Sequence, residues 1–326
     1  MSAAMASRDG NGWVRCELGH RHWGRYGAAG LLAYVANGPV LLQRRTWWSH
    51  HGGTWGLPGG ARDSHETAVA AALREAAEEC GVPADAVRQR GLFIDDHGGW
   101  SYVSVLADAD APFPVESDYD ETDEVAWVEL PKVTELDLHP GLAAHWAELQ
   151  DQLSPVTIIV DGANVVGSRP DGWWRDRAGA ALRLRNQLAP LVTAGITELP
   201  AGLQSLAEAP ATADELPTAT GMGGGDGGSS RPGRGIAGMA DGQIRMRWMP
   251  DVVLVVEGAA RPAAAQADGS PVQVVAAAGS GDDTIAALAA QTTGRRIVVT
   301  ADRELRQRCL AAGASVAGPG WLLGLL

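Results

Sequence analysis

The feature that most constrains the fold is the stretch GARDSHETAVAAALREAAEECGV, residues 60–82. A glycine-rich loop leads into an alanine-rich run that ends at Gly-Val-Pro, which predicts a helix over about 64–80. On that helix Glu75, Glu78 and Glu79 stand at positions i, i+3 and i+4, so their three carboxylates share one face. Like charges this close repel one another. The face therefore predicts a cation site, and carboxylate oxygens suit Mg²⁺ or Mn²⁺.

A solvated acidic helix face is the simplest alternative, but it explains neither the glycine loop nor the regular spacing. The stretch resembles the Nudix box, GX5EX7REUXEEXGU with U aliphatic, and departs from it only at Ala76, a small residue at the first aliphatic position. The resemblance covers about residues 24–150. It implies an α/β/α sandwich with a mixed sheet, and an enzyme that hydrolyses the acid anhydride of a nucleoside diphosphate linked to another group.

The resemblance also implies how the metal is bound. Glu78 and Glu79 correspond to metal ligands, and Glu75 to a further ligand or to a residue that orients the base. The main-chain carbonyl of Gly60 would complete the coordination. A divalent cation in this place bridges phosphate oxygens and lowers the pKa of a bound water, which then attacks phosphorus.

Other residues near the box extend the predicted site. The resemblance implies that Glu66 and Arg74 pair and brace the loop against the helix. Glu121 and Glu124, in ETDEVAWVEL, stand where many Nudix enzymes place an extra ligand or base, although surface charge beside a strand explains them equally well.

Aromatic and histidine side chains precede the box. Those at positions 47, 48, 50 and 51, in WWSHH, form a rim that either stacks on a nucleobase or packs the loop. Cys16, His20 and His22, in CELGHRHWG, have a spacing that can hold zinc. No fourth ligand and no CxxC pair is evident, so we expect a structural role for this segment.

The second half of the chain places acids after apolar runs that read as parallel strands. These acids are Asp161, Glu257, Asp282, Asp283 and Asp302. The carboxyl ends of strands line the ligand crevice of an open parallel sheet, so such acids can converge and bind one or two Mg²⁺ ions. Individually, each has a simpler explanation as a turn residue or a helix cap.

The strings VDGANVV, GSGDDTI and VVTADRELRQRCLAAGA are similar to the NYN domains of the YacP-like, PIN-like nuclease group. The resemblance covers about residues 156–318 and implies a three-layer α/β fold with a parallel sheet and a metal-dependent ribonuclease. The residues it implies are Asp161, Asn164, Asp282 or Asp283, and Asp302. Asn164 would position a phosphate or a metal-bound water. The chain departs from the pattern at Glu257, where an aspartate is expected.

Charge is distributed unevenly between the two halves. Of 26 Lys+Arg and 39 Asp+Glu, residues 1–153 hold 11 and 23, a net charge of −12, and residues 154–326 hold 15 and 16, a net of −1. A total charge of −13 disfavours nucleic-acid binding, but the second half is nearly neutral, so its charge does not exclude binding. Its arginines between positions 169 and 185, with Trp173 and Trp174, fit either a single-stranded RNA surface or a solvated helix.

A length of 326 residues predicts two domains, and the two resemblances imply that both are α/β. We expect an N-terminal segment at 1–23, a Nudix domain at 24–153 and a NYN domain at 154–326, with a flexible Gly-rich insertion at about 207–241. The alternative functions are an RNA-processing or RNA-binding factor in which the NYN domain is the main unit, and a scaffold whose NYN domain is inactive.

Three widely spaced cysteines and the lack of a long apolar run predict a cytoplasmic protein without membrane association. The expected partners are a nucleotide-type diphosphate and, through the second half, RNA. The Nudix resemblance also allows a homodimer.

Overall fold

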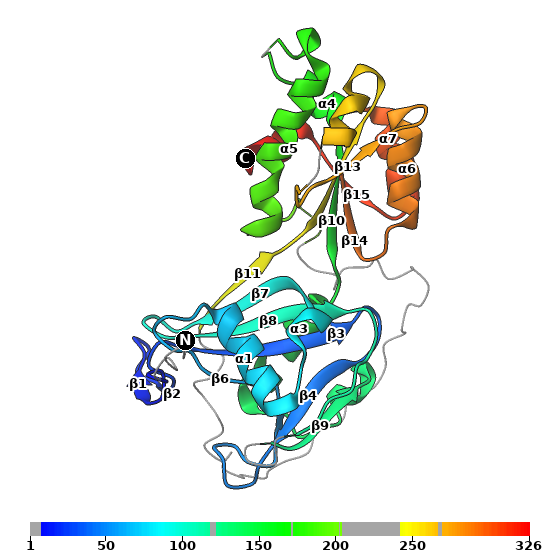
Figure 1. Ribbon diagram of the computed structural model, residues 1–326. Helices are drawn as coiled ribbons and strands as arrows, with labels where there is room; N and C mark the ends of the chain where they lie inside the picture. Colours follow the sequence, from blue (N-terminus) through cyan, green and yellow to red (C-terminus); the bar gives the residue numbers. More distant parts are fainter. Residues whose placement is uncertain (1–7, 118–121, 171, 202, 204–241, 267–268) are drawn as a thin grey trace, which may run out of the picture.

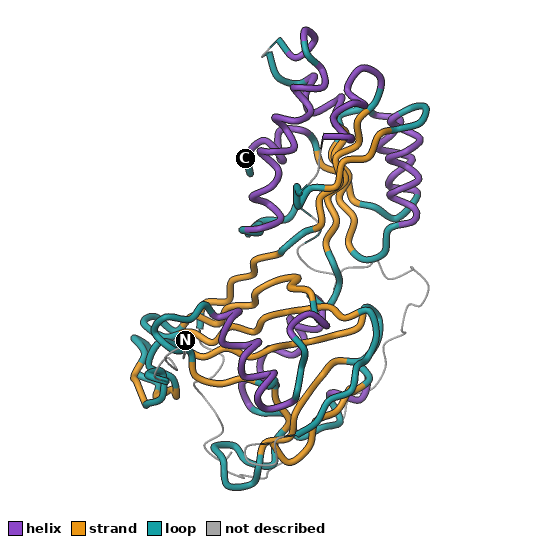
Figure 2. The backbone as a smooth tube through the Cα atoms, in the orientation of Figure 1, coloured by secondary structure: helices purple, strands orange, loops and turns teal. Residues whose placement is uncertain are grey.

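The computed structural model describes residues 8–117, 122–170, 172–201, 203, 242–266 and 269–326. These residues form two α/β halves, one around an eight-stranded sheet and one around a five-stranded sheet (Figure 1; Figure 2). The Gly-rich insertion predicted at about 207–241 lies outside the described residues. In the described part of the chain, no helix combines the length and apolarity needed to cross a bilayer.

The first half is a mixed sheet with helices on both faces. Its elements are β1 (Trp13–Arg15), β2 (Arg21–Trp23), β3 (Ala28–Val35), β4 (Val40–Arg45), β5 (Trp55–Gly56), β6 (Gly59–Ala61), α1 (Ala68–Cys80), η1 (Ala84–Ala86), β7 (Arg88–Asp96), β8 (Ser101–Ala109), β9 (Thr122–Val128), α2 (Leu130–Val133) and α3 (Pro140–Asp151). Strands β3 and β8 pair in parallel, and the other pairs are antiparallel. Alternation along β3 places Leu31 in the core under α1 and Leu32 in the core under α3.

Helix α1 carries the acidic residues of the box and is held at both ends. It begins four residues later than the sequence pattern indicates, because Thr67 is the N-cap and its hydroxyl accepts a hydrogen bond from the Ala70 N–H at 3.1 Å. Gly81, with φ of +67°, closes the other end in the left-handed conformation that favours glycine. Ala76, the departure from the box, is fully buried in the core with Leu31, so a small side chain fits against the sheet.

The second half is a parallel sheet in the order β13-β12-β10-β14-β15. Its elements are β10 (Val156–Asp161), α4 (Gly162–Gly167), η2 (Trp173–Arg175), α5 (Arg177–Thr193), β12 (Asp251–Val256), η3 (Gly258–Gln266), β13 (Gln273–Ala276), α6 (Gly281–Gln291), β14 (Arg295–Val299), α7 (Arg303–Ala311), β15 (Ser315–Ala317) and α8 (Pro319–Gly324). Figure 1 shows α5 on one face and α6 with α7 on the other, over separate apolar cores. The strand order reverses between β10 and β14, where open parallel sheets form their ligand crevice.

Strand β11 (Gln243–Trp248) crosses from the second half back into the first. It pairs antiparallel with β7, with Trp248 opposite Gly91, and forms the edge of the eight-stranded sheet (Figure 1). The boundary predicted at 153/154 falls between α3 and β10, and the sequence pattern gives no sign of this crossing. Beside it, the Arg90 guanidinium bridges Asp108 and Asp251 at 2.8 Å each, linking β7 and β8 to the start of β12.

Candidate functional site

The acidic face of α1 lies against the loop that contains β6. Glu79 is buried, and its Oε2 atom accepts hydrogen bonds from the Gly59 N–H at 2.8 Å and from Gln43 Nε2 at 2.9 Å. Gln43 was not predicted from the sequence. The only signal for it is a polar residue at the end of the apolar run of β4, directly before Arg44 and Arg45. These contacts fix the Glu79 side chain in one orientation, against the loop at the start of the box.

The carboxylates of Glu75 and Glu78 differ in environment. Glu75 is largely buried and its carboxyl lies directly over Gly60, where a Cβ atom would stand 2.7 Å from Glu75 Oε1. Only glycine leaves room for this approach. Burial raises the pKa of Glu75, although the hydrogen bond from Arg74 opposes that shift. Glu78 is 41% exposed and also pairs with Arg8 at 2.5 Å.

Arg74 connects the loop to the helix. Its guanidinium donates two hydrogen bonds to the carboxylate of Glu66, at 2.7 and 2.9 Å, and one to the main-chain carbonyl of Ala61 at 3.2 Å. It also reaches Glu75 at 2.8 Å and Glu78 at 3.3 Å. The hydrogen bonds from Arg74 lower the pKa of Glu66. Bidentate pairing of this kind fixes geometry as well as charge.

Of the two further acids predicted beside the box, Glu121 lies outside the described residues, and the structure places only Glu124. Glu124, on β9, is half-exposed and pairs with Arg44 on the neighbouring strand at 3.4 Å. Thr122, at the start of β9, is linked to the box through Gln43: its hydroxyl donates to Gln43 Oε1 at 2.7 Å, and Gln43 in turn donates to Glu79.

A cavity of about 460 Å³ opens beside the box. Gly59, Gly60 and Glu79 form part of its lining. Its walls are aromatic and basic and include Trp13, Trp23, Trp48, Trp100, His22, His50, His139, Arg21 and Arg45. Of the rim predicted at 47–51, positions 48 and 50 line the cavity, whereas positions 47 and 51 do not.

The positive charge of the cavity comes from its arginines. Burial lowers the pKa of His22 to about 4 and that of His139 to about 4, so both rings are neutral near pH 7. Arg21 and Arg45 therefore supply the cationic groups of the lining. The site combines clustered carboxylates, a close glycine backbone, two guanidinium groups and several indole rings, which suits an anionic ligand with an aromatic part.

Comparison with known proteins agrees with the geometry. The family model described as "NUDIX domain" matches residues 24–149. The protein named "Putative 8-oxo-dGTP diphosphatase 3" from Mycobacterium tuberculosis is 44% identical over 160 residues, which span 46% of this chain and 72% of that protein. The chain belongs to the Nudix family. It is therefore a hydrolase that acts on phosphorus-containing anhydrides.

Other Nudix relatives cover the same half. A "Nucleoside triphosphate pyrophosphatase/Nudix hydrolase fusion protein" from Bifidobacterium longum is 35% identical over 153 residues, 44% of this chain and 32% of that protein. The crystal structure of a Nudix hydrolase from M. smegmatis is 47% identical, with a TM-score of 0.39, over 43% of this chain and 93% of that one. Nudix hydrolases generally use divalent metal ions such as Mg²⁺. The clustered carboxylates of α1 over Gly60 are hard oxygen donors that fit such an ion.

The acids predicted in the second half gather at the carboxyl ends of its strands. Asp161, at the end of the central strand β10, is buried and accepts from the Asn164 N–H at 3.0 Å and the Thr300 hydroxyl at 2.8 Å. Burial raises the pKa of Asp161, and the charges of Glu257 and Asp302 add to that shift. Thr300, which the sequence analysis missed, also accepts from the Asp302 N–H at 3.1 Å.

The remaining acids separate into two groups. Burial, followed by the charges of Asp161, Asp302 and Glu257, raises the pKa of Asp282, so Asp282 lies within the cluster's field. Asp283 is exposed and pairs with Arg308 at 2.8 Å. Glu257 Oε2 accepts the Gly281 N–H at 2.7 Å, where a Cβ atom would collide with the carboxylate. Of the two alternatives that the sequence offered, Asp282 therefore belongs with the acidic cluster, and Asp283 is paired outside it.

The proposed RNA surface is partly occupied by contacts within the chain. Arg185 donates to the main-chain carbonyl of Gln266 at 2.7 Å, and Arg169 donates to Gln187 at 2.6 Å. Trp174 is 58% exposed and remains available as a stacking surface. The aromatic surface beside α5 therefore has fewer arginines free to contact RNA than the sequence suggests.

Proposed function

We propose that the chain is a Mg²⁺- or Mn²⁺-dependent hydrolase that cleaves the diphosphate of a nucleoside diphosphate derivative by attack of water at phosphorus. The observation that carries the proposal is the placement of Glu79 and Gly60 on the lining of a cavity with indole and guanidinium walls, with the Glu75 carboxyl directly over Gly60. The carboxylates supply metal ligands, and the walls suit the base and the phosphates of one ligand.

Each residue of the box then has a defined task. Glu78 and Glu79 hold the cation with the Gly60 carbonyl, and Glu75 is a further ligand or orients the base. Arg74 and Glu66 maintain the distance between the loop and α1. A divalent ion held there lowers the pKa of a bound water and offsets the charge that builds on the phosphate oxygens.

The walls of the cavity favour a purine nucleotide. Trp13, Trp23 and Trp48 offer large aromatic faces on which a base can stack. Arg21 and Arg45 provide guanidinium groups, which pair well with phosphate oxygens. Because the M. tuberculosis relative is named as a diphosphatase of 8-oxo-dGTP, that nucleotide is the first substrate we propose.

The purified full chain should convert 8-oxo-dGTP to its monophosphate when Mg²⁺ or Mn²⁺ is present, and should stop when EDTA is added. The measurement is chromatography of the products against a panel with dGTP, ADP-ribose, a dinucleoside polyphosphate and capped RNA. Faster turnover of another member of the panel would overturn the proposed substrate but would leave the assignment as a nucleotide hydrolase in place. Turnover of none would contradict the proposal as a whole.

We propose a second activity for the C-terminal half, that of a PIN-like NYN domain acting as a metal-dependent ribonuclease. The observation that favours it is that Thr300 links Asp161 to Asp302 at the switch point of a five-stranded parallel sheet, with Glu257 and Asp282 near enough for their charges to act on the same group. Their mutual repulsion would be relieved by a cation. In this proposal residues 24–153, extended by β11, form the Nudix unit, and the rest of 154–326 forms the NYN unit.

Single-stranded RNA should be cut by the wild-type chain with Mn²⁺, and the double variant Asp161→Asn/Asp302→Asn should not cut it. Gel analysis of end-labelled RNA follows the reaction, and Asp283→Asn is the matched control because that side chain pairs with Arg308 outside the cluster. Equal cleavage by the double variant would exclude the proposed site. Salt-dependent RNA binding without cleavage would favour an RNA-binding factor. If the chain neither binds nor cleaves RNA, a scaffold with an inactive NYN domain would be favoured.

A further inference from the structure

A cluster of one cysteine and three histidines lies at the N-terminal hairpin, outside the acidic site on α1. The hairpin β1-β2 carries Cys16, His20 and His22, whose spacing by itself lacks a fourth ligand. The fold supplies one, His97, from the turn after β7. One candidate ligand atom from each of the four side chains lies within 4.8 Å of all the others. His97 is about 75 residues away in sequence from the other three, which is why the spacing alone could not reveal it.

Main-chain contacts bring the hairpin turn to His97. The Cys16 N–H donates to the His20 carbonyl at 3.1 Å, which closes the turn between the two strands. The Glu17 N–H donates to the Gly98 carbonyl at 2.9 Å and joins this turn to the loop after β7. Cys16, His22 and His97 are each less than a tenth exposed, so the cluster is enclosed.

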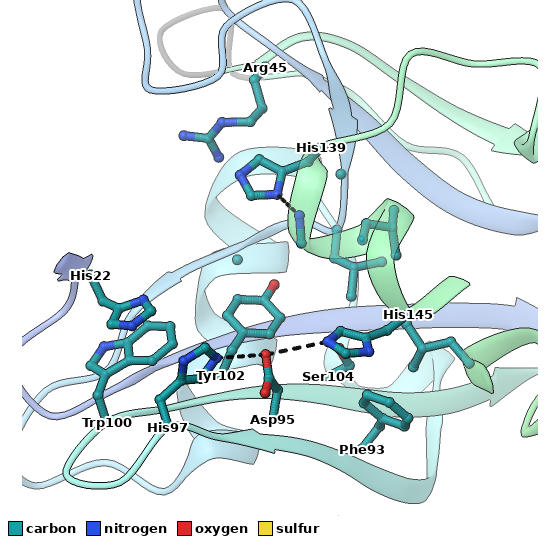
Figure 3. A pocket seen from close by; sticks show the side chains of 16 residues that line it. His22, Arg45, Phe93, Asp95, His97, Trp100, Tyr102, Ser104, His139 and His145 are labelled. Carbon is teal, nitrogen blue, oxygen red and sulfur yellow. Dashed lines mark hydrogen bonds and ion pairs between the residues drawn. The ribbon is translucent and has the colours of Figure 1, made fainter. Parts of the chain in front are cut away.

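The His97 ring is oriented as a metal ligand usually is. Its Nε2 atom lies 3.0 Å from Asp95 Oδ2 (Figure 3). Its other nitrogen, Nδ1, lies 3.5 Å from His20 Nδ1. A carboxylate on the far nitrogen is the usual support of a metal-binding histidine. The His22 ring stacks on Trp100 with centroids 3.8 Å apart. Among the described residues, His22 Nε2 has no hydrogen-bond partner, although it is buried.

We propose that Cys16, His20, His22 and His97 bind one Zn²⁺ ion as a structural site. Thiolate and imidazole are ligands that tetrahedral Zn²⁺ favours, and bond lengths of about 2.0–2.3 Å would hold the ligand atoms about 3.5 Å apart. The four atoms therefore need to approach one another by at most about 1.3 Å from their limit of 4.8 Å. On binding, the Cys16 thiol releases its proton to solvent.

The site would fasten the hairpin to the sheet. All four ligands come from the protein, as in structural zinc sites, whereas catalytic sites keep one position open. Trp13 and Trp23 pair across the hairpin, with ring centroids 5.5 Å apart, and both line the cavity beside the acidic box. The ion thus holds one wall of that cavity in place without contributing to the chemistry.

Metal analysis of the purified full chain tests the proposal. The wild type, grown with added zinc and freed of loosely bound metal, should retain one zinc per chain, and Cys16→Ser and His97→Ala should each lose it. Matched controls are Cys309→Ala, which removes a buried thiol of the second half, and His65→Ala, which removes an exposed imidazole. Glu78→Gln should also keep its zinc, which separates this site from the acidic one. Absence of zinc from the wild type, or another metal in its place, would overturn the assignment.

Three further measurements do not depend on whether the ligand variants fold. Wild-type chain loaded with Co²⁺ should show a thiolate-to-cobalt charge-transfer band, and a spectrum without that band would rule out Cys16 as a ligand. Asp95→Asn should still bind zinc but with affinity lowered about 10- to 100-fold, as expected for a residue that supports a ligand. Removal of zinc should speed tryptic cleavage after Arg15 and Arg21, which are exposed on the hairpin. An unchanged cleavage rate would contradict the fastening role.

Discussion

Replacing Glu78 by glutamine should lower the rate of nucleotide hydrolysis by at least about 10³-fold while leaving the fold intact. A bound divalent ion contributes several kcal/mol of charge stabilisation, and each 1.36 kcal/mol corresponds to a tenfold change in rate. Glu78 is the most exposed of the three box carboxylates, and it is not packed in the core, so an amide of equal size fits in its place. Steady-state kinetics with saturating Mg²⁺ measures the effect.

The matched control for this experiment is Glu135→Gln, which neutralises an exposed carboxylate far along the chain from the box. Its kinetic constants should equal those of the wild type, and both variants should unfold at the wild-type temperature. Turnover by Glu78→Gln within tenfold of the wild type would remove Glu78 from the set of metal ligands.

Arg90→Ala should destabilise the chain by about 3 kcal/mol, because it removes the cation from a mostly buried ion pair. The guanidinium is 5% exposed and contacts Asp108 and Asp251 at 2.8 Å each, and Asp108 is itself largely buried. Without Arg90 the Asp108 carboxylate loses its nearest positive charge in a region of low polarity. Urea unfolding followed by circular dichroism and by tryptophan fluorescence measures the loss.

Arg88 provides the comparison for this variant. It lies two residues earlier on β7 and pairs with the same Asp108, but at 3.5 Å and with 63% of its side chain exposed. Exposed pairs contribute about 0–1 kcal/mol, so Arg88→Ala should be close to neutral. Equal destabilisation by the two variants would show that burial at Arg90 is not the cause.

The parts of the molecule that could be predicted from the sequence are those set by local spacing. Glu75, Glu78 and Glu79 share a face because a helix repeats every 3.6 residues, whatever surrounds it. The long apolar strands of both halves follow from runs of buried residues in the same way. Helix α1 begins later than expected because Thr67 is its N-cap, a choice that depends on the turn before it.

Residues that depend on tertiary contacts could not be found in this way. Gln43 contacts Glu79, and Thr122 contacts Gln43, only because β4 and β9 pair beside α1. Thr300 joins Asp161 to Asp302 across adjacent strands, and His97 meets the hairpin across a turn. In each case the partner lies dozens of residues away, and one sequence carries no signal for which distant residues meet.

The pairing of β11 with β7 also bears on how the chain can be divided. With β11 in place, β7 is an interior strand. A fragment that stops at the predicted boundary would leave β7 paired with β8 on one side only, and its backbone N–H and C=O groups on the β11 side would lose their partners, beside apolar residues such as Leu92 and Ile94. Unprotected strand edges recruit other strands and promote aggregation. The hydrolase half is therefore not a module that can be excised by a single cut, and a soluble version must carry its last strand by fusion or circular permutation.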